Sequence, residues 1–519
     1  MGELWLAVFI FLYTLWYIIC ASDKRTRIHY ESWTYSRFSM LGLCITLLFF
    51  SCTSTTESLS PYFSKNIGLM YFELLITLLT IFHLCLSWNY NMSVHIKRFE
   101  YHISMLVNLF SILMLIQTVD IVCFIVFMEL MSISAVLLCT THRSGLLATE
   151  AALKYFLLSA VSSLIVILGL SFIYGATGSS QFSDILYILR TSITSEYQQI
   201  DVTVNSGIMP HTTFSMLYNI GICCVVIGFL FKLYVFPAGF WIIDIYEGAP
   251  TSITFYLAVV YYLSMTYVFL KIYHVLIADF FHTTDTLFYI CGVASILMSI
   301  GAAYQQKIKS FLAHSSMGYS GYLYLACASH SITLLEDSFK LTVWYAITLS
   351  GFFALLLELW DHPNYLKHGQ YRAIVLIDDM APLLRDRRKV AYVYALLMCS
   401  LSGLPPFAGF FVKIGFLGSL LSAGMNWLVL FLVLCTATTV YAYARIVAKL
   451  YNKVLTGAPG TKSLTNKNVL YARTILLCTV LVLHTPDYIV PAVESMFYGN
   501  IIYWPHKPLT KPLIYNFFK

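Results

Sequence analysis

The sequence predicts an all-α polytopic membrane protein. Hydrophobic residues make up 59% of the 519 residues and charged residues only 11%, which leaves too little polar surface to cover a soluble domain. Apolar runs of about 20 residues recur along the chain, and each is long enough to cross a hydrocarbon core of about 30 Å as a helix. These runs lack the alternation of a β-barrel strand.

The runs divide into about fourteen expected transmembrane helices. They cover residues 4–20, 38–53, 67–88, 103–117, 119–140, 151–174, 214–246, 251–277, 286–304, 311–329, 338–360, 390–423, 426–451 and 470–493. Only the weak polar break "QTVD" at 117–120 separates the fourth span from the fifth, and joining them would give a count of thirteen. Residues 103–140 are too long for one crossing, so we expect two helices there.

Loop charges support this count. Connections that follow odd-numbered spans carry eighteen Lys and Arg residues, whereas the even-numbered connections and both tails carry six. Because basic residues concentrate in loops on the cytoplasmic or matrix side, both termini are expected on the outer side. The net charge of +6 then reflects topology, and no nucleic-acid partner is expected.

Cofactor and nucleotide motifs are not found. The thirteen cysteines are scattered without a C-x-x-C spacing, so the sequence gives no basis for an iron–sulfur cluster or a metal site. Neither a G-x-G-x-x-G fingerprint nor a P-loop is present. The first apolar run starts by Leu4 with no basic leader, which is typical of a bacterial inner-membrane protein or one made inside an organelle.

Lys232 is the most informative charge, because it lies near the middle of the seventh span in "IGFLFKLYVFP". A lysine at that depth is costly, and such residues usually mark ion or proton pathways. The following Pro237-Ala238-Gly239 should interrupt the helix and free carbonyl groups that need water or polar partners. We therefore expect a hydrated cavity beside a buried amine.

A second break of similar composition occurs in the twelfth span. "FPAGF" at 236–240 is matched by "PFAGF" at 406–410, which follows Pro405, and Lys413 lies seven residues beyond Pro406. Five spans separate the two breaks, so their helices cross in opposite directions, as in inverted-repeat transporters with midplane ion sites. The alternative is two coincidental kinks, since Pro and Gly are common in membrane helices.

Glu129 lies in the middle of the fifth span, and Lys232 is its candidate partner. A facing amine would keep the buried carboxylate ionised, and separation of the pair would leave Lys232 desolvated, so that it releases a proton. The alternative is a buried salt bridge that only fixes helix packing. Lys154 forms an i,i+4 pair with Glu150 and is a lower-ranked candidate, and Lys271 is expected to snorkel towards the interface.

Four strings resemble signature segments of the subunit 2 family of NADH:quinone oxidoreductase, respiratory complex I. They are "ATEAALKYFLLSAVSS", "GFLFKLYVFPAGFWIIDIYEGAPTS", "QQKIKSFLAHSSMGYSGYL" and "SLSGLPPFAGFFVKIGF", and the similarity covers about residues 103–451. Any one string alone would also fit the antiporter-like subunits 4 and 5 or the cation/proton antiporters. In combination and order they favour subunit 2.

The resemblance implies a proton-translocating module of the membrane arm. It implies an N-terminal three-helix segment (1–102), a first five-helix repeat (103–277), a second five-helix repeat (278–451) and a C-terminal helix with a tail (452–519). The family's proton-carrying residues fall on Glu129, Lys232 and Lys413. FMN, iron–sulfur clusters and ubiquinone are expected on other subunits, and other membrane-arm subunits and lipids are the expected partners.

One departure from the family concerns the eighth span. The family usually carries a further lysine there, and the matching position here is Tyr262 or close to it. A tyrosine keeps its proton to about pH 10, so it could pass protons only through its hydroxyl within a water chain. Either Tyr262 and water bridge the gap, or Lys271 reaches back, or the channel has lost capacity.

Two functions from different classes therefore remain open. One is a proton-pumping subunit driven by quinone reduction elsewhere, and the other is a structural subunit with an impaired channel. A stand-alone sodium/proton antiporter is a third, disfavoured by the few midspan carboxylates. Phe and Tyr far exceed Trp, as expected for an AT-rich organellar genome, so we expect the mitochondrial inner membrane, with the bacterial inner membrane as the alternative.

Overall fold

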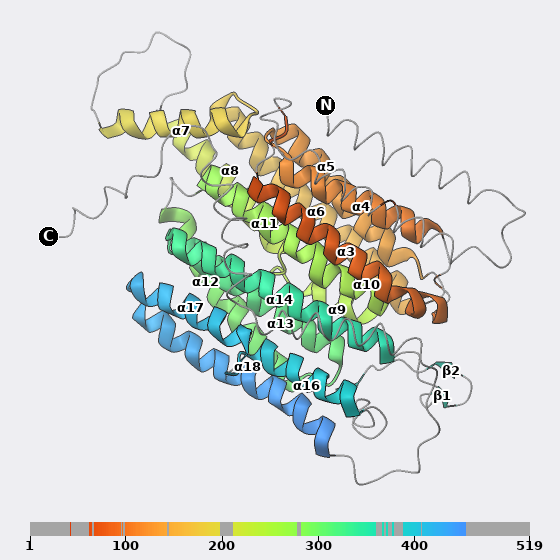
Figure 1. The fold of residues 1–519 in the computed structure, drawn as a ribbon. Coiled ribbons are helices and arrows are strands. Elements are labelled where there is room, and N and C mark those ends of the chain that lie inside the picture. The colour runs from red at the N-terminus through yellow and green to blue at the C-terminus, as the bar shows by residue number, and fades with distance from the viewer. Residues whose placement is uncertain are drawn as a thin grey trace, which may run out of the picture.

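The protein is a bundle of long helices in the part of the chain that the structure describes (Figure 1). The computed structural model describes residues 62–452 except 65–66, 95, 97–98, 143–144, 198–210, 278–281, 406 and most of 360–387, together with Gly42. The strands among the described residues form one short hairpin of two residues each, β1 (Leu366–Lys367) and β2 (Gln370–Tyr371), with Leu366 opposite Tyr371. The predicted all-α membrane class is confirmed.

Eight of the described helices are long and apolar enough to cross a membrane. The α-helices are α3 (Ile67–Ser93), α4 (Phe99–Gln117), α5 (Ile121–Thr140), α6 (Leu146–Thr177), α7 (Phe182–Tyr197), α8 (His211–Lys232), α9 (Trp241–Gly248), α10 (Thr251–Tyr256), α11 (Tyr262–Ile272), α12 (His282–Ile300), α13 (Ile308–Ala328), α14 (Ile332–Leu359), α16 (Arg388–Ser402), α17 (Ala408–Ser422) and α18 (Asn426–Asn452). The first, second and fourteenth expected spans lie outside the described residues. The count of fourteen and the repeat boundaries therefore stay predictions.

Residues 103–140 form two helices, as the weak polar break suggested. Asp120 caps the N-terminus of α5, because its carboxylate accepts hydrogen bonds from the N–H groups of Val122 (3.0 Å) and Cys123 (3.3 Å). The helices pack side by side, and the Asn108 amide on α4 donates to Met131 O (2.8 Å) and Ser134 Oγ (2.7 Å) on α5.

The eighth expected span is the centre of the described bundle. It consists of α10, the π-helical turn η2 (Leu257–Tyr261), α11 and a second π-helical turn η3 (Tyr273–Ile277). Every residue of its most apolar stretch is buried inside the protein. π-helical turns inside helices are frequent at functional sites, and η2 ends directly before Tyr262.

The helices α6 and α8 approach closely through facing glycines. A Cβ atom at Gly169 would lie 2.6 Å from Gly221 O, and one at Gly221 would lie 2.9 Å from Gly169 O. Small residues at such contacts allow membrane helices to pack backbone against backbone. This contact fixes α8, whose last residue is Lys232, against α6.

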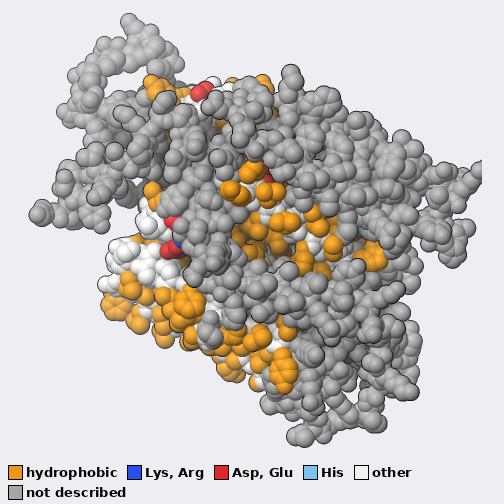
Figure 2. Space-filling view, in the orientation of Figure 1, with side chains coloured by type: hydrophobic (Ala, Val, Ile, Leu, Met, Phe, Trp, Pro, Cys, Tyr) orange, Lys and Arg blue, Asp and Glu red, His pale blue; other side chains and the backbone are white. Residues whose placement is uncertain are grey.

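Two external features complete the arrangement. The helix α7, which was not expected from the sequence, lies across one end of the bundle (Figure 1). The described surface in Figure 2 is mostly hydrophobic, with charged side chains at only a few points. Exposed Leu and Phe residues on α6 and exposed Leu and Val residues on α18 agree with surfaces that face lipid or other apolar partners.

The α6–α8 contact predicts a strong dependence on side-chain size. Gly169→Val should destabilise the protein by about 1–3 kcal/mol, because the new side chain collides with the backbone of α8. The measurement is the thermal unfolding midpoint of the detergent-solubilised protein. Gly175→Val on the same helix is the control, since a Cβ atom there meets nothing within 4 Å. Equal midpoints for both variants would contradict this packing.

Candidate functional site

The seventh expected span is interrupted directly after Lys232. The helix α8 ends at this residue, residues 233–240 form turns, and α9 resumes at Trp241. Within the turns Tyr234 has a φ of 61°, and the Phe236–Pro237 peptide bond is cis. Gly239 is needed at its position because a Cβ atom there would lie 2.2 Å from Tyr234 O. The freed N–H of Phe236 donates to Ser295 Oγ on α12 (2.9 Å).

Lys232 is buried inside this break. The residue is 3% exposed, and its Nζ makes no hydrogen bond to any residue that the structure describes. A buried ammonium without a partner is strongly unfavourable, so the site calls for water or for a mobile charged partner. Because Lys232 is buried and has no partner among the described residues, its amine is available to bind water or a charged group.

Glu129 on α5 attracts Lys232 electrostatically but is not in direct contact with it. The Ser132 hydroxyl, one turn along α5, donates to the Glu129 backbone O (2.8 Å) and lies 3.3 Å from the Glu129 carboxylate, which is its weaker acceptor. Between these two described residues the predicted ion pair is therefore open. The Lys232 amine and the Glu129 carboxylate could therefore pair with each other or with a third group.

A series of four tyrosine rings, three buried and one partly buried, leads from the first break towards the second. The rings of Tyr234 and Tyr262 stack with centroids 5.9 Å apart, and Tyr262 meets Tyr345 of α14 edge to face at 6.2 Å. Tyr345 stacks on Tyr319 of α13 at 4.0 Å, and Lys413 Nζ lies 5.9 Å from the centre of the Tyr319 ring. The hydroxyls of Tyr234 and Tyr262 are buried without hydrogen-bond partners. We call these four tyrosines the tyrosine axis.

Lys413 lies on α17, beside the second break, which separates α16 from α17. Its Nζ donates to Ser402 O (2.8 Å) and Leu401 O (3.3 Å), which are carbonyls at the C-terminal end of α16. Gly403 has a φ of 82°, and a Cβ atom there would lie 2.8 Å from the Lys413 side chain. Pro405 lies in the turn, and Pro406 is outside the described residues.

A small cavity lies between Lys413 and the tyrosine axis. It has a volume of about 30 Å³, enough for a water molecule, and Ser315, Tyr319, Lys413 and Tyr443 are among its lining residues. The Ser315 hydroxyl is also 3.1 Å from the Tyr345 hydroxyl. Polar groups thus continue from the axis to the second amine.

A larger vestibule of about 490 Å³ lies at one end of α6, α9 and α13. Lys154 pairs there with Asp244 (2.7 Å) and Glu150 (2.8 Å), and Lys307 pairs with Glu247. The connections at this end follow the fifth, seventh and ninth expected spans, which belong to the basic, inner set. Lys154 is therefore part of the vestibule and does not contact Glu129.

Lys271 is partly exposed near the end of the eighth expected span, and its amine donates to Ile116 O (2.8 Å) and Thr118 O at the C-terminal end of α4. The unsatisfied carbonyls of α4 explain this direction, because a helix end inside the protein needs a donor. Lys271 therefore does not reach back to the position of Tyr262. Its expected snorkelling towards the interface stays a prediction.

Sequence reasoning missed three members of the site. Ser295, Tyr319 and Tyr345 lie on helices other than those with the two breaks, and only the packing brings them there. Their signal in the sequence was weak, because tyrosines and serines are common along the whole chain.

The described fold and site define a class of membrane protein, one in which interrupted helices place lysines along a polar interior. The family model of the NADH:quinone oxidoreductase/Mrp antiporter transmembrane region matches residues 118–439. The chain belongs to this family.

Two matching relatives show the degree of sequence identity, which is 27% and 30%. NADH-ubiquinone oxidoreductase chain 2 of Oenothera berteroana is 27% identical over 418 residues, covering 79% of this chain and 80% of the relative. NADH-quinone oxidoreductase subunit N of Methylobacterium nodulans is 30% identical over 365 residues, covering 69% and 68%.

Solved structures share the fold. A chain of respiratory complex I from Thermus thermophilus with bound aureothin is similar with a TM-score of 0.69 and 22% identity, over 95% of this chain and all of the other. A chain of the Mrp complex from Dietzia sp. is similar with a TM-score of 0.74 and 16% identity, over 97% of both chains.

The first break predicts a specific role for Ser295. Ser295→Ala should destabilise the protein by about 1–3 kcal/mol, because the buried N–H of Phe236 loses its acceptor. Ser171→Ala is the control, since that exposed hydroxyl bonds only to Leu168 O of its own helix. Thermal unfolding of the solubilised protein measures both. An unchanged midpoint for Ser295→Ala would show that the N–H has another acceptor.

Proposed function

We propose that this chain is a proton-translocating core subunit of the membrane arm of NADH:ubiquinone oxidoreductase. The observation that carries the proposal is Lys232, a buried amine without a hydrogen-bond partner, at a helix break and within electrostatic reach of Glu129. Its family and its subunit N and chain 2 relatives support the same function.

In this proposal Lys232 gains and loses a proton as Glu129 approaches and withdraws. With the carboxylate close, the ammonium form is favoured, and with the carboxylate distant the buried charge is unfavourable and the proton leaves. The vestibule beside Lys154 is the proposed entrance from the inner side. The vestibule lies at the end of α9, whose first turn follows the break that holds Lys232.

Tyr262 is the proposed relay between the two halves. Its hydroxyl can donate and accept a hydrogen bond at once, so it can pass a proton along a chain of waters without becoming charged. The unpartnered hydroxyls of Tyr234 and Tyr262 support this role, because buried polar groups in proteins are usually satisfied by protein or ordered water. Lys413, beyond the small cavity, is the proposed second proton carrier.

A structural role without proton transfer is the second candidate. The close stacking of Tyr319 on Tyr345 favours it, because contiguous rings can seal the interior against water. The family's eighth-helix lysine is replaced by a tyrosine, which also favours a weakened channel. The two candidates differ in whether the tyrosine hydroxyls are needed.

The setting of the subunit is part of the proposal. We expect a multi-pass protein of the mitochondrial inner membrane, with a bacterial inner membrane as the alternative, surrounded by other membrane-arm subunits and lipid. FMN, iron–sulfur clusters and ubiquinone would bind elsewhere in the complex. Quinone reduction there would drive Glu129 and Lys232 through conformational or electrostatic coupling.

Substitution of the central pair tests the function. Lys232→Ala and Glu129→Ala should each lower proton movement per NADH oxidised in the assembled complex, because the buried amine or its partner is lost. Proton uptake in sealed vesicles and the quinone reductase rate are the two measurements. Lys449→Ala, near the end of α18, is a control that removes a lysine outside the proposed path. Full coupling in both central variants, in a fully assembled complex, would rule out the proposal.

Substitution of Tyr262 separates the two candidate functions. Tyr262→Phe removes only the hydroxyl, so it should reduce proton movement if the axis conducts and leave it unchanged if the axis is a seal. Tyr262→Lys should retain or raise it, because the family's usual amine is restored. The control is Tyr324→Phe, which removes another buried, unpartnered hydroxyl away from the axis. Equal effects of the two Phe variants would point to a packing defect.

A further inference from the structure

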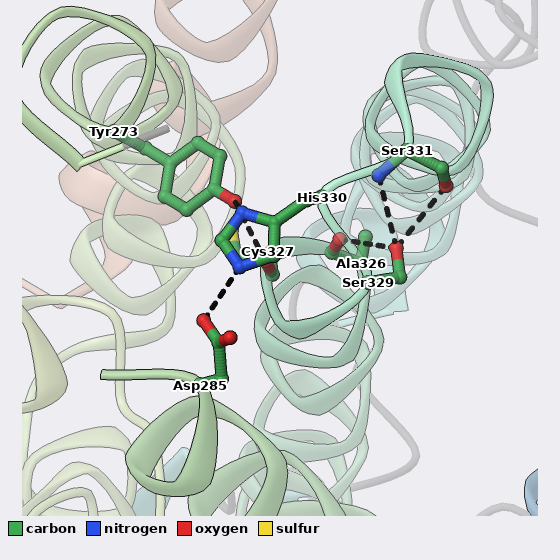
Figure 3. A network of polar contacts seen from close by, with 7 residues as sticks. All are labelled: Tyr273, Asp285, Ala326, Cys327, Ser329, His330 and Ser331. Atoms are coloured by element: carbon green, nitrogen blue, oxygen red, sulfur yellow. Dashed lines mark hydrogen bonds and ion pairs between the residues drawn. The ribbon is translucent and has the colours of Figure 1, made fainter. Parts of the chain in front are cut away.

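Three elements meet in a polar cluster (Figure 3). The cluster follows the C-terminal end of α13, whereas the vestibule lies at the N-terminal end of that helix. Asp285 lies in the first turn of α12, His330 lies in the turn between α13 and α14, and Tyr273 is the first residue of η3. The connections at this end follow the eighth and tenth expected spans, which belong to the outer set of loops. Tyr273 comes from the first expected repeat and the other two residues come from the second.

The hydrogen bonds of the cluster can be assigned atom by atom. The Tyr273 hydroxyl donates its single hydrogen to Cys327 O at 2.6 Å, because a carbonyl oxygen can only accept. Its oxygen must then accept from His330 Nδ1 at 3.1 Å. The other ring nitrogen, Nε2, lies 2.6 Å from Asp285 Oδ1, and a hydrogen must lie between these atoms.

This assignment fixes the number of protons. The imidazole carries a hydrogen on Nδ1, and a second hydrogen is shared between Nε2 and the carboxylate. An imidazolium facing a carboxylate and a neutral imidazole facing a carboxylic acid both contain this second hydrogen. In either form the Asp285–His330 pair holds one proton more than a neutral histidine beside an ionised aspartate.

The pair is placed to exchange that proton with the outer solution. The side chains of His330 and Asp285 are 33% and 22% exposed, whereas the ring of Tyr273 is fully buried. His330 has a φ of 51°, a left-handed conformation that few residues other than Gly, Asn, Asp and His adopt readily. The strained backbone holds the imidazole between its two partners.

We propose that Asp285 and His330 form a proton-binding site on the outer face, and that the bound proton clasps the last helix of the first repeat to the second repeat. Loss of the proton removes one donor from the imidazole. Two hydrogens then remain for three hydrogen bonds. The ring loses Asp285 or Tyr273, or the Tyr273 hydroxyl turns to Nδ1 and releases Cys327 O on α13. The end of α13 or the α13–α14 turn therefore loses a bond to α12 or to η3 when the pair is deprotonated.

Other titratable groups lie on the elements packed around the imidazole. They are His274 beside Tyr273 on η3, the Cys327 thiol on α13, and Glu336, Asp337 and Lys340 in the first turns of α14, where Lys340 pairs with Glu336 at 2.7 Å. Their charges set the pH at which the clasp opens. The neighbouring His274 is the group most able to imitate the response of His330.

Hydrogen–deuterium exchange in the intact complex tests the clasp. We expect peptides that span 326–334 to exchange about tenfold more slowly at pH 5.5 than at pH 8.5, after correction for intrinsic rates, as expected when a charge-assisted hydrogen bond is lost. His330→Asn should abolish this difference, because asparagine tolerates the left-handed backbone but cannot bridge both partners. Asp285→Asn should also abolish the difference, because an amide can donate to a neutral imidazole as well as accept from it, so the cluster no longer needs the extra proton.

Two control variants accompany this measurement. Ser331→Ala removes a hydroxyl that bonds Ser329 beside the cluster, and it should keep the full pH response. His274→Asn should also keep it. The proposal is overturned if the natural protein shows no transition, if the transition persists in His330→Asn, or if His274→Asn is the variant that loses it. Exchange is measured without NADH or quinone, so the result does not depend on whether the chain translocates protons.

Discussion

A membrane helix that stops inside the protein leaves backbone groups that only the protein or enclosed water can satisfy, and this constraint organises the structure. At the end of α4 the carbonyls of Ile116 and Thr118 receive Lys271. At the end of α16 the carbonyls of Leu401 and Ser402 receive Lys413. At the first break the N–H of Phe236 donates to the hydroxyl of Ser295, and Lys232 has no hydrogen-bond partner among the described residues.

The same constraint separates two kinds of lysine among the membrane helices. Lys271 completes a helix end, and removing it would leave carbonyls unsatisfied. Lys232 satisfies no helix-end carbonyl in the described structure, so helix capping does not explain a lysine at that depth. Lys413 combines both kinds, since it satisfies α16 while it also borders a cavity large enough for a water molecule. Lys232 is the buried one of the three, since Lys271 and Lys413 are partly exposed, and their hydrogen bonds separate them further.

Composition and helix-breaking residues predicted much of this architecture. Apolar run lengths predicted the helical class, and "QTVD" predicted the end of α4 and the start of α5. Pro237 and Gly239 predicted the interruption of the seventh span, which the structure places directly after Lys232. These features are local, because they follow from residues within about one helical turn of each other.

Other features depend on packing between distant segments and could not be predicted. The direction of Lys271 depends on the end of α4, about 155 residues away, and the tyrosine axis draws on α11, α13 and α14. The cluster at His330 depends on a turn conformation and on Asp285, which lies 45 residues earlier. A single sequence gives the residue types at these places but not which of them face each other.

The two π-helical turns have a mechanical consequence for the central helix. Each wide turn accommodates an extra residue relative to an α-helix, and η2 and η3 lie directly before and after α11. A shift of the extra residue at both ends would rotate α11 by about 100°, the angle between successive residues, without changing its length. Tyr262 and Lys271, at opposite ends of α11, would turn together, so a movement at the outer end would be transmitted to the middle of the membrane as a rotation.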